Sequence, residues 1–218
     1  MSEPIVTKLQ PTKRDPARVM IRVAGAVRAT LPRSVVERLG IAVETPWTDA
    51  LEARVAEAVD RDKAERYAIN ALGRRALSSG ELAERIRRRG HGSAVAEAVV
   101  AKMVERRFVD DEAYGRAVIR AERARRPAGP RLLRQKLIHK RLDRSLIDRL
   151  IAEIEAEQDH VAEARRLVES RLRQPSVQRL DPVVRRRRLW NQLARRGFAP
   201  DAIEAALADL DRGEFPDA

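Results

Sequence analysis

Apolar and small residues recur at the same spacings in three stretches of the chain. In each stretch four positions follow the first by 4, 14, 18 and 21 residues: Leu82, Ile86, Ala96, Val100 and Met103; Leu133, Leu137, Ile147, Ile151 and Ile154; Leu189, Leu193, Ile203, Leu207 and Leu210. Spacings of three and four residues place side chains on one face of a helix. The pattern predicts three tandem helical repeats. Because each small unit buries its apolar face partly against its neighbours, it also predicts an elongated curved solenoid.

Turn residues divide each repeat into three helices. Gly90 and Gly92, the segment from Pro127 to Pro130, and Gly197 interrupt the helical pattern. Ser78 and Glu81 form a capping-box sequence, and Pro130 suits the first position of a helix. We therefore expect three-helix repeats at 62–108, 109–157 and 158–211, and a frayed tail at 212–218. The expected helices are 63–77, 80–89 and 93–107; 111–126, 130–141 and 144–157; and 159–173, 182–196 and 200–210.

The first 60 residues follow a different pattern. β-branched residues alternate with polar ones at 5–10, 18–23 and 26–31, and Ala24-Gly25 offers a tight turn between the last two. A short helix is expected from Pro32 or Ser34 to Gly40, and another from Thr48 or Asp49 to about Val59. The fold class is therefore mainly α, with a small module at 1–60 that contains a β-hairpin and short helices.

The positive charge is concentrated in the middle of the chain. The net charge is +12, and residues 85–141 hold 17 basic and 6 acidic side chains, whereas 1–60, 61–84 and 142–218 are each within one charge of neutrality. A solvated surface is the alternative, but the local shortage of acids favours binding to a polyanion or an acidic protein face. The predicted contact residues are Arg85, Arg88, Arg89, Arg123, Arg125, Arg126, Arg131, Arg134, Lys136, Lys140 and Arg141.

The chain shows no pattern typical of catalysis. It contains no Cys, its three His residues are isolated, and no Gly precedes Lys as in a phosphate-binding loop. Asp110 and Asp111 fit helix capping better than a paired-carboxylate site, because they stand where a helix is expected to begin. We expect a protein that is not an enzyme and binds no cofactor or metal. Without a signal peptide or an apolar run of membrane-spanning length, we expect it in the cytoplasm.

Several motifs resemble one known family. Asp110, Asp111 and Tyr114 match a pattern of Asp-Asp, two variable residues and an aromatic, and Gly129, Pro130 and Leu133 match a Gly-Pro-x-x-Leu helix start. With the segments Ser79 to Leu82 and Arg195-Arg196-Gly197-Phe198, residues 62–210 resemble the RecX family of bacterial regulatory proteins. His91 and Arg141-Leu142 depart from the family's aromatic and Gly-Phe-like turn residues.

The resemblance implies three tandem three-helix repeats and a role in recombination, DNA repair and the SOS response. It implies binding to the RecA recombinase and to its filament on single-stranded DNA, with inhibition of strand exchange, ATP hydrolysis and co-protease activity. We expect a monomer with weak direct DNA binding. An alternative stays open: a sequence-nonspecific DNA-binding protein whose second and third helices form helix-turn-helix-like pairs with phosphate contacts.

Overall fold

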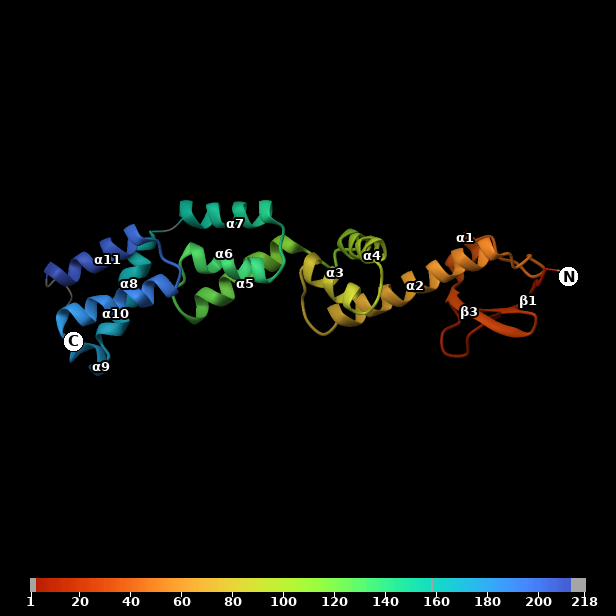
Figure 1. The fold of residues 1–218 in the computed structure, drawn as a ribbon, viewed down its shortest axis with the longest axis horizontal. Coiled ribbons are helices and arrows are strands. Elements are labelled where there is room, and N and C mark those ends of the chain that lie inside the picture. The colour runs from red at the N-terminus through yellow and green to blue at the C-terminus, as the bar shows by residue number, and fades with distance from the viewer. Residues whose placement is uncertain (1–2, 158, 213–218) are drawn as a thin grey trace. The chain divides into compact units, whose positions relative to one another are not determined.

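The computed structural model describes residues 3–157 and 159–212, and it is mainly helical with one small sheet (Figure 1). The chain forms two compact units. The first contains the described residues up to Arg75 together with Leu82–Phe108. The second contains Ala76–Glu81 together with the described residues from Val109 onward. Each unit has its own buried core.

The N-terminal module in the first unit is a three-stranded antiparallel sheet. Its strands β1 (Val6–Pro11), β2 (Arg18–Val23) and β3 (Ala26–Pro32) lie in the order β1-β2-β3. Ala24 and Gly25, between β2 and β3, both have positive φ, as a two-residue hairpin turn requires. Alternate residues of β2 point into a core shared with α1 (Arg33–Arg38) and the start of α2 (Asp49–Leu72). The predicted hairpin is confirmed.

Helix α2 is one continuous element of 24 residues. The prediction of separate helices, one ending near Val59 and one beginning at Lys63, is wrong. The polar residues around position 60 suggested a break, but no Gly or Pro lies between Thr48 and Gly73, so nothing in the backbone ends the helix there. Asp62 instead pairs with Arg18 of β2 at 2.7 Å. In the same unit α2 packs against α4 (Ser93–Glu105).

The helices of the second unit agree with the predicted ones within about two residues at each end. Its first segment is the initial turn of α3 (Ser79–Arg88). The pattern did not predict the one-turn helix α9, which begins with a proline at its first turn. The remaining helices are α5 (Asp111–Arg125), α6 (Pro130–His139), α7 (Arg144–Glu157), α8 (His160–Leu172), α9 (Pro175–Gln178), α10 (Pro182–Arg195) and α11 (Pro200–Arg212).

The repeated hydrophobic register is confirmed by burial. Fourteen of its fifteen side chains are described, and each is at most 9% exposed. The side chain of Leu210, the fifteenth, lies outside the described residues. So does the predicted frayed tail, except for Arg212 as the last residue of α11. Burial at matched positions in all three copies shows that the spacing reports a core and is not a chance alignment of Leu and Ala.

A turn with left-handed backbone recurs at one position of the register. Gly90, Arg141 and Gly197 each stand eight residues after the first apolar position of their repeat, and their φ angles are 92°, 53° and 80°. For a residue with a side chain this conformation costs about 1–2 kcal/mol, so Arg141 must be held by its surroundings. The Arg141-Leu142 departure from a Gly-Phe turn therefore changes the residues but keeps the backbone path.

In the second unit each of these turns receives the start of a helix from elsewhere in the chain. The N–H of Gly129 donates to the carbonyl of Arg196 at 2.8 Å, and the N–H of Arg131 donates to the carbonyl of Gly197 at 3.2 Å. At the matching positions Ser78 Oγ donates to the carbonyl of Lys140, and the backbone of Gly80 lies against Arg141. We call these two contacts the helix-turn junctions.

The junctions leave no room for a side chain. A Cβ on Gly80 would overlap the Arg141 carbonyl oxygen, and a Cβ on Gly129 would overlap that of Gly197. Gly129 itself has φ −75°, which any residue adopts, so steric contact rather than backbone freedom requires glycine there. This explains physically why a helix start of the Gly-Pro type is needed at this point.

We predict that Gly129→Ala destabilises the protein by about 1–3 kcal/mol more than Gly92→Ala, because inserting a methyl group into a packed contact forces the backbone apart. Both glycines are N-cap residues with extended backbone, and nothing lies within 4 Å of a Cβ built on Gly92. Urea denaturation of the full chain, followed by helical circular dichroism, measures the difference. Equal costs for the two substitutions would contradict the steric account.

Candidate functional site

The predicted cations of α3 in the first unit are tied to neighbours on the same unit. Arg88 Nε donates to Glu84 Oε1 at 2.9 Å. The guanidinium of Arg89 lies over the ring of Tyr67, 4.8 Å from its centroid, which is a cation-π distance. Arg85 is half-buried. These three side chains are therefore less available to bind a partner than the charge count suggested.

Four predicted cations of the second unit form ion pairs within it. Arg123 donates to Glu163 at 2.5 Å, and this pair is largely shielded from solvent. Arg134 pairs with Asp148. The other two pairs join Lys136 to Glu122 at 3.5 Å and Lys140 to Glu81 at 3.8 Å. A carboxylate already offsets each of these charges, so their contribution to attracting a polyanion is reduced.

Arg116, in the same basic stretch, is also neutralised locally. It donates to Glu112 at 3.0 Å and to Glu153 at 2.8 Å. The pKa of Glu112 lies below its ordinary value, mainly because it accepts a hydrogen bond from Arg149 and also one from Arg116. These groups are exposed and form a surface network that links α5 with α7. Part of the excess charge of residues 85–141 is therefore offset within the fold.

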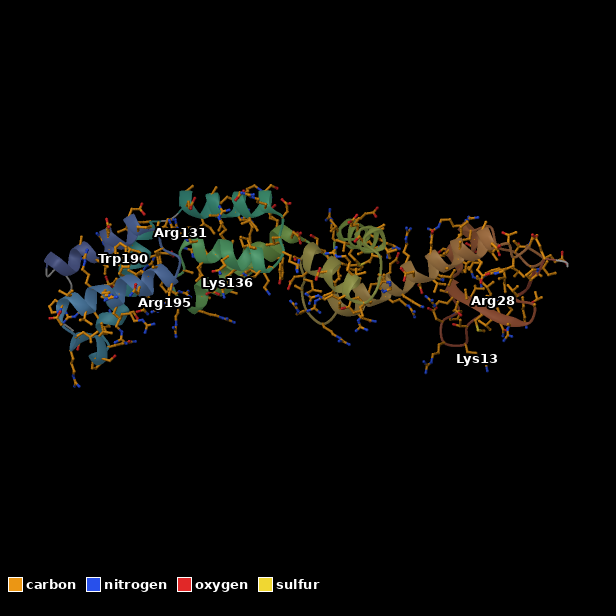
Figure 2. All side chains as sticks on the ribbon, viewed as in Figure 1. Lys13, Arg28, Arg131, Lys136, Trp190 and Arg195 are labelled. Atoms are coloured by element: carbon orange, nitrogen blue, oxygen red, sulfur yellow. The ribbon has the colours of Figure 1, made fainter. Side chains whose placement is uncertain are left out.

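Three of the predicted contact residues in the second unit keep an uncompensated charge. Arg125, Arg126 and Arg131 are exposed, and among the described residues no carboxylate lies within ion-pair distance of any of them. Arg141 is exposed as well, and its backbone forms the left-handed turn described above. Figure 2 shows Arg131 together with Lys136 on the second unit. Arg125, Arg126 and Arg131 lie in or next to the loop between α5 and α6, whereas Arg141 follows the other end of α6.

Arg196 holds that loop in place. Its Nε donates to the carbonyl of Pro127 at 2.8 Å, and one terminal nitrogen donates to the carbonyl of Arg126 at 2.8 Å. The other terminal nitrogen donates to Glu122 at 3.1 Å. The backbone carbonyl of Arg196 also accepts from the N–H of Gly129, so this one residue forms hydrogen bonds with both the start and the end of the loop. A planar guanidinium with several fixed donors suits this clamp.

Across the loop, α8 supplies two further arginines. Arg125 and Arg126 line a groove of about 330 Å³ together with Arg166 and Arg171. Its other lining residues are Pro127, Leu167, Ser170 and Gln174, so none of them is acidic. We call this the arginine groove.

The sequence prediction missed Arg166 and Arg171. Residues 142–218 have a net charge of −1, and that balance made the segment look neutral. Counting charge along the chain averages residues that the fold separates, so this signal does not reveal a groove. Only the approach of α8 to the loop after α5 brings the four guanidinium groups together.

The run Arg185 to Arg188 divides into two pairs on α10. Arg185 donates to the carbonyls of Gln178 and Leu180, and Arg186 donates to the carbonyl of Leu207 at 3.4 Å. Arg187 and Arg188 point away into solvent. Together with Val184, Asn191 and Arg195 they line a second hollow, which lies on α10; Arg195 is labelled in Figure 2.

The family-like motif residues lie at the junctions. Asp110 caps α5 by accepting from the N–H of Ala113 at 2.8 Å, which confirms its predicted capping role. Asp111 accepts from both the N–H and the hydroxyl of Ser79. Tyr114 donates to Glu81 at 2.9 Å. The Asp-Asp and aromatic pattern therefore joins the start of α5 to the segment Ala76–Glu81.

The Gly-Pro motif and the Gly-Phe turn meet at the other junction. Pro130 occupies the first turn of α6 as predicted, and Leu133 is fully buried behind it. Gly197 has positive φ, and Phe198 is buried in the core of α8, α10 and α11. The eight motif residues thus hold the fold together, and none of them lines the arginine groove.

Within residues 3–157 and 159–212, no group of three or more His, Cys, Asp or Glu side chains is placed to hold a metal ion. None of the described helices is long and apolar enough to cross a membrane.

The fold defines a helical-repeat protein built from three-helix domains. Three family models match in tandem: the first three-helix domain of RecX at 64–103, the second at 110–151 and the third at 157–207. The first two matches fall inside the first two predicted repeats, and the third begins one residue before the predicted third repeat at 158–211. The chain belongs to the RecX family of regulatory proteins, as its relatives show.

Among these relatives, a regulatory protein RecX of Geobacillus kaustophilus (strain HTA426) is 30% identical over 188 residues, which cover 85% of this chain and 68% of that protein. Another, of Pelodictyon phaeoclathratiforme (strain DSM 5477 / BU-1), is 31% identical over 141 residues, covering 65% and 84%.

Two solved structures have the same fold. A crystal structure of regulatory protein RecX superposes with a TM-score of 0.76 at 19% identity, covering 92% of this chain and 97% of that one. RecX from Lactobacillus salivarius superposes with a TM-score of 0.60 at 17% identity, covering 70% and 97%.

We predict that Arg196→Ala destabilises the second unit by about 2 kcal/mol, since it leaves two loop carbonyls without their charged donor and removes one of the two cations that pair with Glu122. Arg195→Ala is the matched control: this neighbouring arginine is exposed, and its removal is expected to stay within about 0.5 kcal/mol. Thermal unfolding and amide hydrogen exchange of Gly129 measure the two effects. Equal protection of Gly129 in both variants would show that Arg196 is not a clamp.

Proposed function

We propose that this protein binds the RecA recombinase and its filament on single-stranded DNA, and thereby inhibits strand exchange, ATP hydrolysis and co-protease activity. Membership of a regulatory family supports this assignment. The single structural observation that carries it is the set of uncompensated arginines around the α5–α6 loop. A nucleoprotein filament presents both phosphates and acidic side chains to such a surface.

The eleven cations predicted from charge remain the proposed contact residues, and their surroundings rank them. Arg125, Arg126 and Arg131 come first, because they are exposed and unpaired among the described residues. Arg141 and Arg89 follow as exposed side chains with partners of their own, and Arg85, which is half-buried, comes after them. The last group already forms internal ion pairs and would have to exchange an internal carboxylate for an anion of the partner, which adds less binding energy. This group contains Arg88, Arg123, Arg134, Lys136 and Lys140.

Arginine is suited to a filament regulator. Its planar fork makes two parallel hydrogen bonds to a carboxylate or to a phosphate, so one surface can recognise both components of a nucleoprotein complex. Tandem three-helix repeats offer such contacts to more than one filament subunit. Binding that bridges subunits restrains filament growth or turnover, and both capping an end and lining the filament groove satisfy this description.

The second candidate is a sequence-nonspecific DNA-binding protein. The short turns between α6 and α7 and between α10 and α11 give helix pairs like those of helix-turn-helix proteins, and the arginine groove suits phosphate contacts. In this reading DNA alone would be the partner. The family assignment favours the regulator, because its proteins carry a regulatory name.

We predict that the protein inhibits DNA-dependent ATP hydrolysis by RecA at a ratio well below one per RecA, and that reversing Arg125, Arg126 and Arg131 to Glu reduces this inhibition at least tenfold. Reversal replaces attraction by repulsion at three exposed positions without breaking an internal pair. The control reverses Arg187, Arg188 and Arg195 on α10, which carry equal charge. Full inhibition by the loop variant would refute this choice of contact surface.

A titration on DNA without RecA separates the two candidates. The regulator is expected to bind single- and double-stranded DNA only with micromolar affinity, since its full contact surface requires the filament. Nanomolar affinity for DNA alone, with a steep loss as salt rises, would favour the DNA-binding protein. Filter binding across a range of salt concentrations provides the measurement.

A further inference from the structure

We propose that the arginine groove binds the sugar-phosphate backbone of single-stranded DNA, so that this protein holds the strand directly. The inference rests on the proposed function, in which the partner is a filament on single-stranded DNA, and it assigns one component of that partner to one site. It also assigns a role to Arg166 and Arg171, which lie in the third repeat, outside the basic stretch of the sequence.

Four guanidinium groups around one hollow form a strong anion site. Arginine does not lose its proton in proteins, so the mutual repulsion of Arg125, Arg126, Arg166 and Arg171 cannot be relieved by deprotonation. No carboxylate lines the groove to offset them. An anion that enters therefore gains the attraction of several charges at once, in a concave site where solvent screens them less than on an open face.

Arg171 is held by neutral groups, which position it and leave its charge uncompensated. It donates to Gln174 Oε1 at 3.2 Å. Gln192 of α10 is oriented so that its amide oxygen faces Arg171. That oxygen accepts two further hydrogen bonds, from Arg171 Nη2 at 2.7 Å and from Arg171 Nε at 2.5 Å. A guanidinium oriented by amide oxygens is preorganised for a ligand, because no internal salt bridge has to be broken first.

The opposite wall is also preorganised. The clamp formed by Arg196 fixes the backbone carbonyls of Arg126 and Pro127, and so holds the loop that carries Arg125 and Arg126. Along α8, Arg166 and Arg171 are separated by about 7.5 Å at the helical rise of about 1.5 Å per residue. Neighbouring phosphates can therefore contact different arginines.

The remaining lining fits a nucleotide chain better than a single carboxylate. Ser170 and Gln174 add neutral hydrogen-bonding groups, and Pro127 and Leu167 add a small apolar surface for a sugar or a base. A phosphodiester carries its charge on the chain itself, so a strand that lies along the groove brings one charge for each unit without ordering separate side chains. An acidic peptide has to order a flexible side chain for every charge that it brings.

The test uses the full chain, without RecA, and a fluorescently labelled oligothymidylate followed by anisotropy. Replacing Arg125, Arg126 and Arg166 by Gln removes three exposed charges from the groove. We expect affinity to fall at least tenfold, and the slope of log affinity against log salt to decrease by about two, since each phosphate contact to a single strand contributes about 0.7. Unchanged affinity would overturn the proposal.

The matched control replaces Arg187, Arg188 and Arg195 by Gln, which removes the same charge from α10, where these residues line a hollow that shares no residue with the arginine groove. Its affinity should change less than threefold. An equal loss in both variants would mean that net charge, and not the groove, attracts the strand, and this also overturns the proposal. Urea denaturation of both variants checks that they are folded.

Two further arms separate the possible ligands and the two proposals. Displacement of the strand from the wild-type protein by polyglutamate at matched charge concentration would assign the groove to an acidic polypeptide and overturn the DNA assignment. Inhibition of RecA is measured in parallel. If the groove binds the strand but the protein does not inhibit RecA, the DNA assignment stands and the proposed function is refuted. If the protein inhibits RecA but does not bind the strand, the proposed function stands and the DNA assignment is refuted.

Discussion

The fold of the second unit depends on the close approach of a helix start to a left-handed turn. At Gly129 the chain comes so near to Gly197 that a single methyl group would overlap a carbonyl oxygen, and backbone N–H groups at the helix start find their acceptors in that turn. The same approach recurs where Gly80 meets Arg141. A helix N-terminus has unsatisfied donors and a turn has unsatisfied acceptors, so pairing them satisfies both without a side-chain cap.

This constraint also produces the candidate site. Arg196 directly precedes the left-handed residue Gly197, and this position orients two of its groups. Its backbone carbonyl accepts from the N–H of Gly129, and its side chain holds the α5–α6 loop. The loop in turn presents Arg125 and Arg126 toward α8. Residues that build the junction therefore lie beside residues of the candidate site. Gly129 and Arg196 form the junction, and the exposed Arg125 and Arg126 are held in place by it.

Much of the fold could be predicted because burial and helix periodicity are local properties. The apolar spacing identified the helices, and Pro130 and Gly197 marked a start and a turn as expected. The continuous path of α2 could not be predicted from the polar residues near Asp60, because a helix also tolerates exposed charge. The left-handed backbone of Arg141 could not be predicted either, since an arginine adopts that conformation only when tertiary contacts hold it.

The candidate site was harder to predict, because charge acts through space and the sequence shows it only along the chain. The basic stretch was real, but Glu163 neutralises Arg123 from 40 residues away, and Glu122 lies between Lys136 and Arg196. Conversely, Arg166 and Arg171 belong to a segment that is neutral on average yet face a hollow without acids. What attracts a polyanion is the charge left after internal pairing. By that measure the groove beside α8 is a stronger anion site than the basic stretch of residues 85–141 taken as a whole.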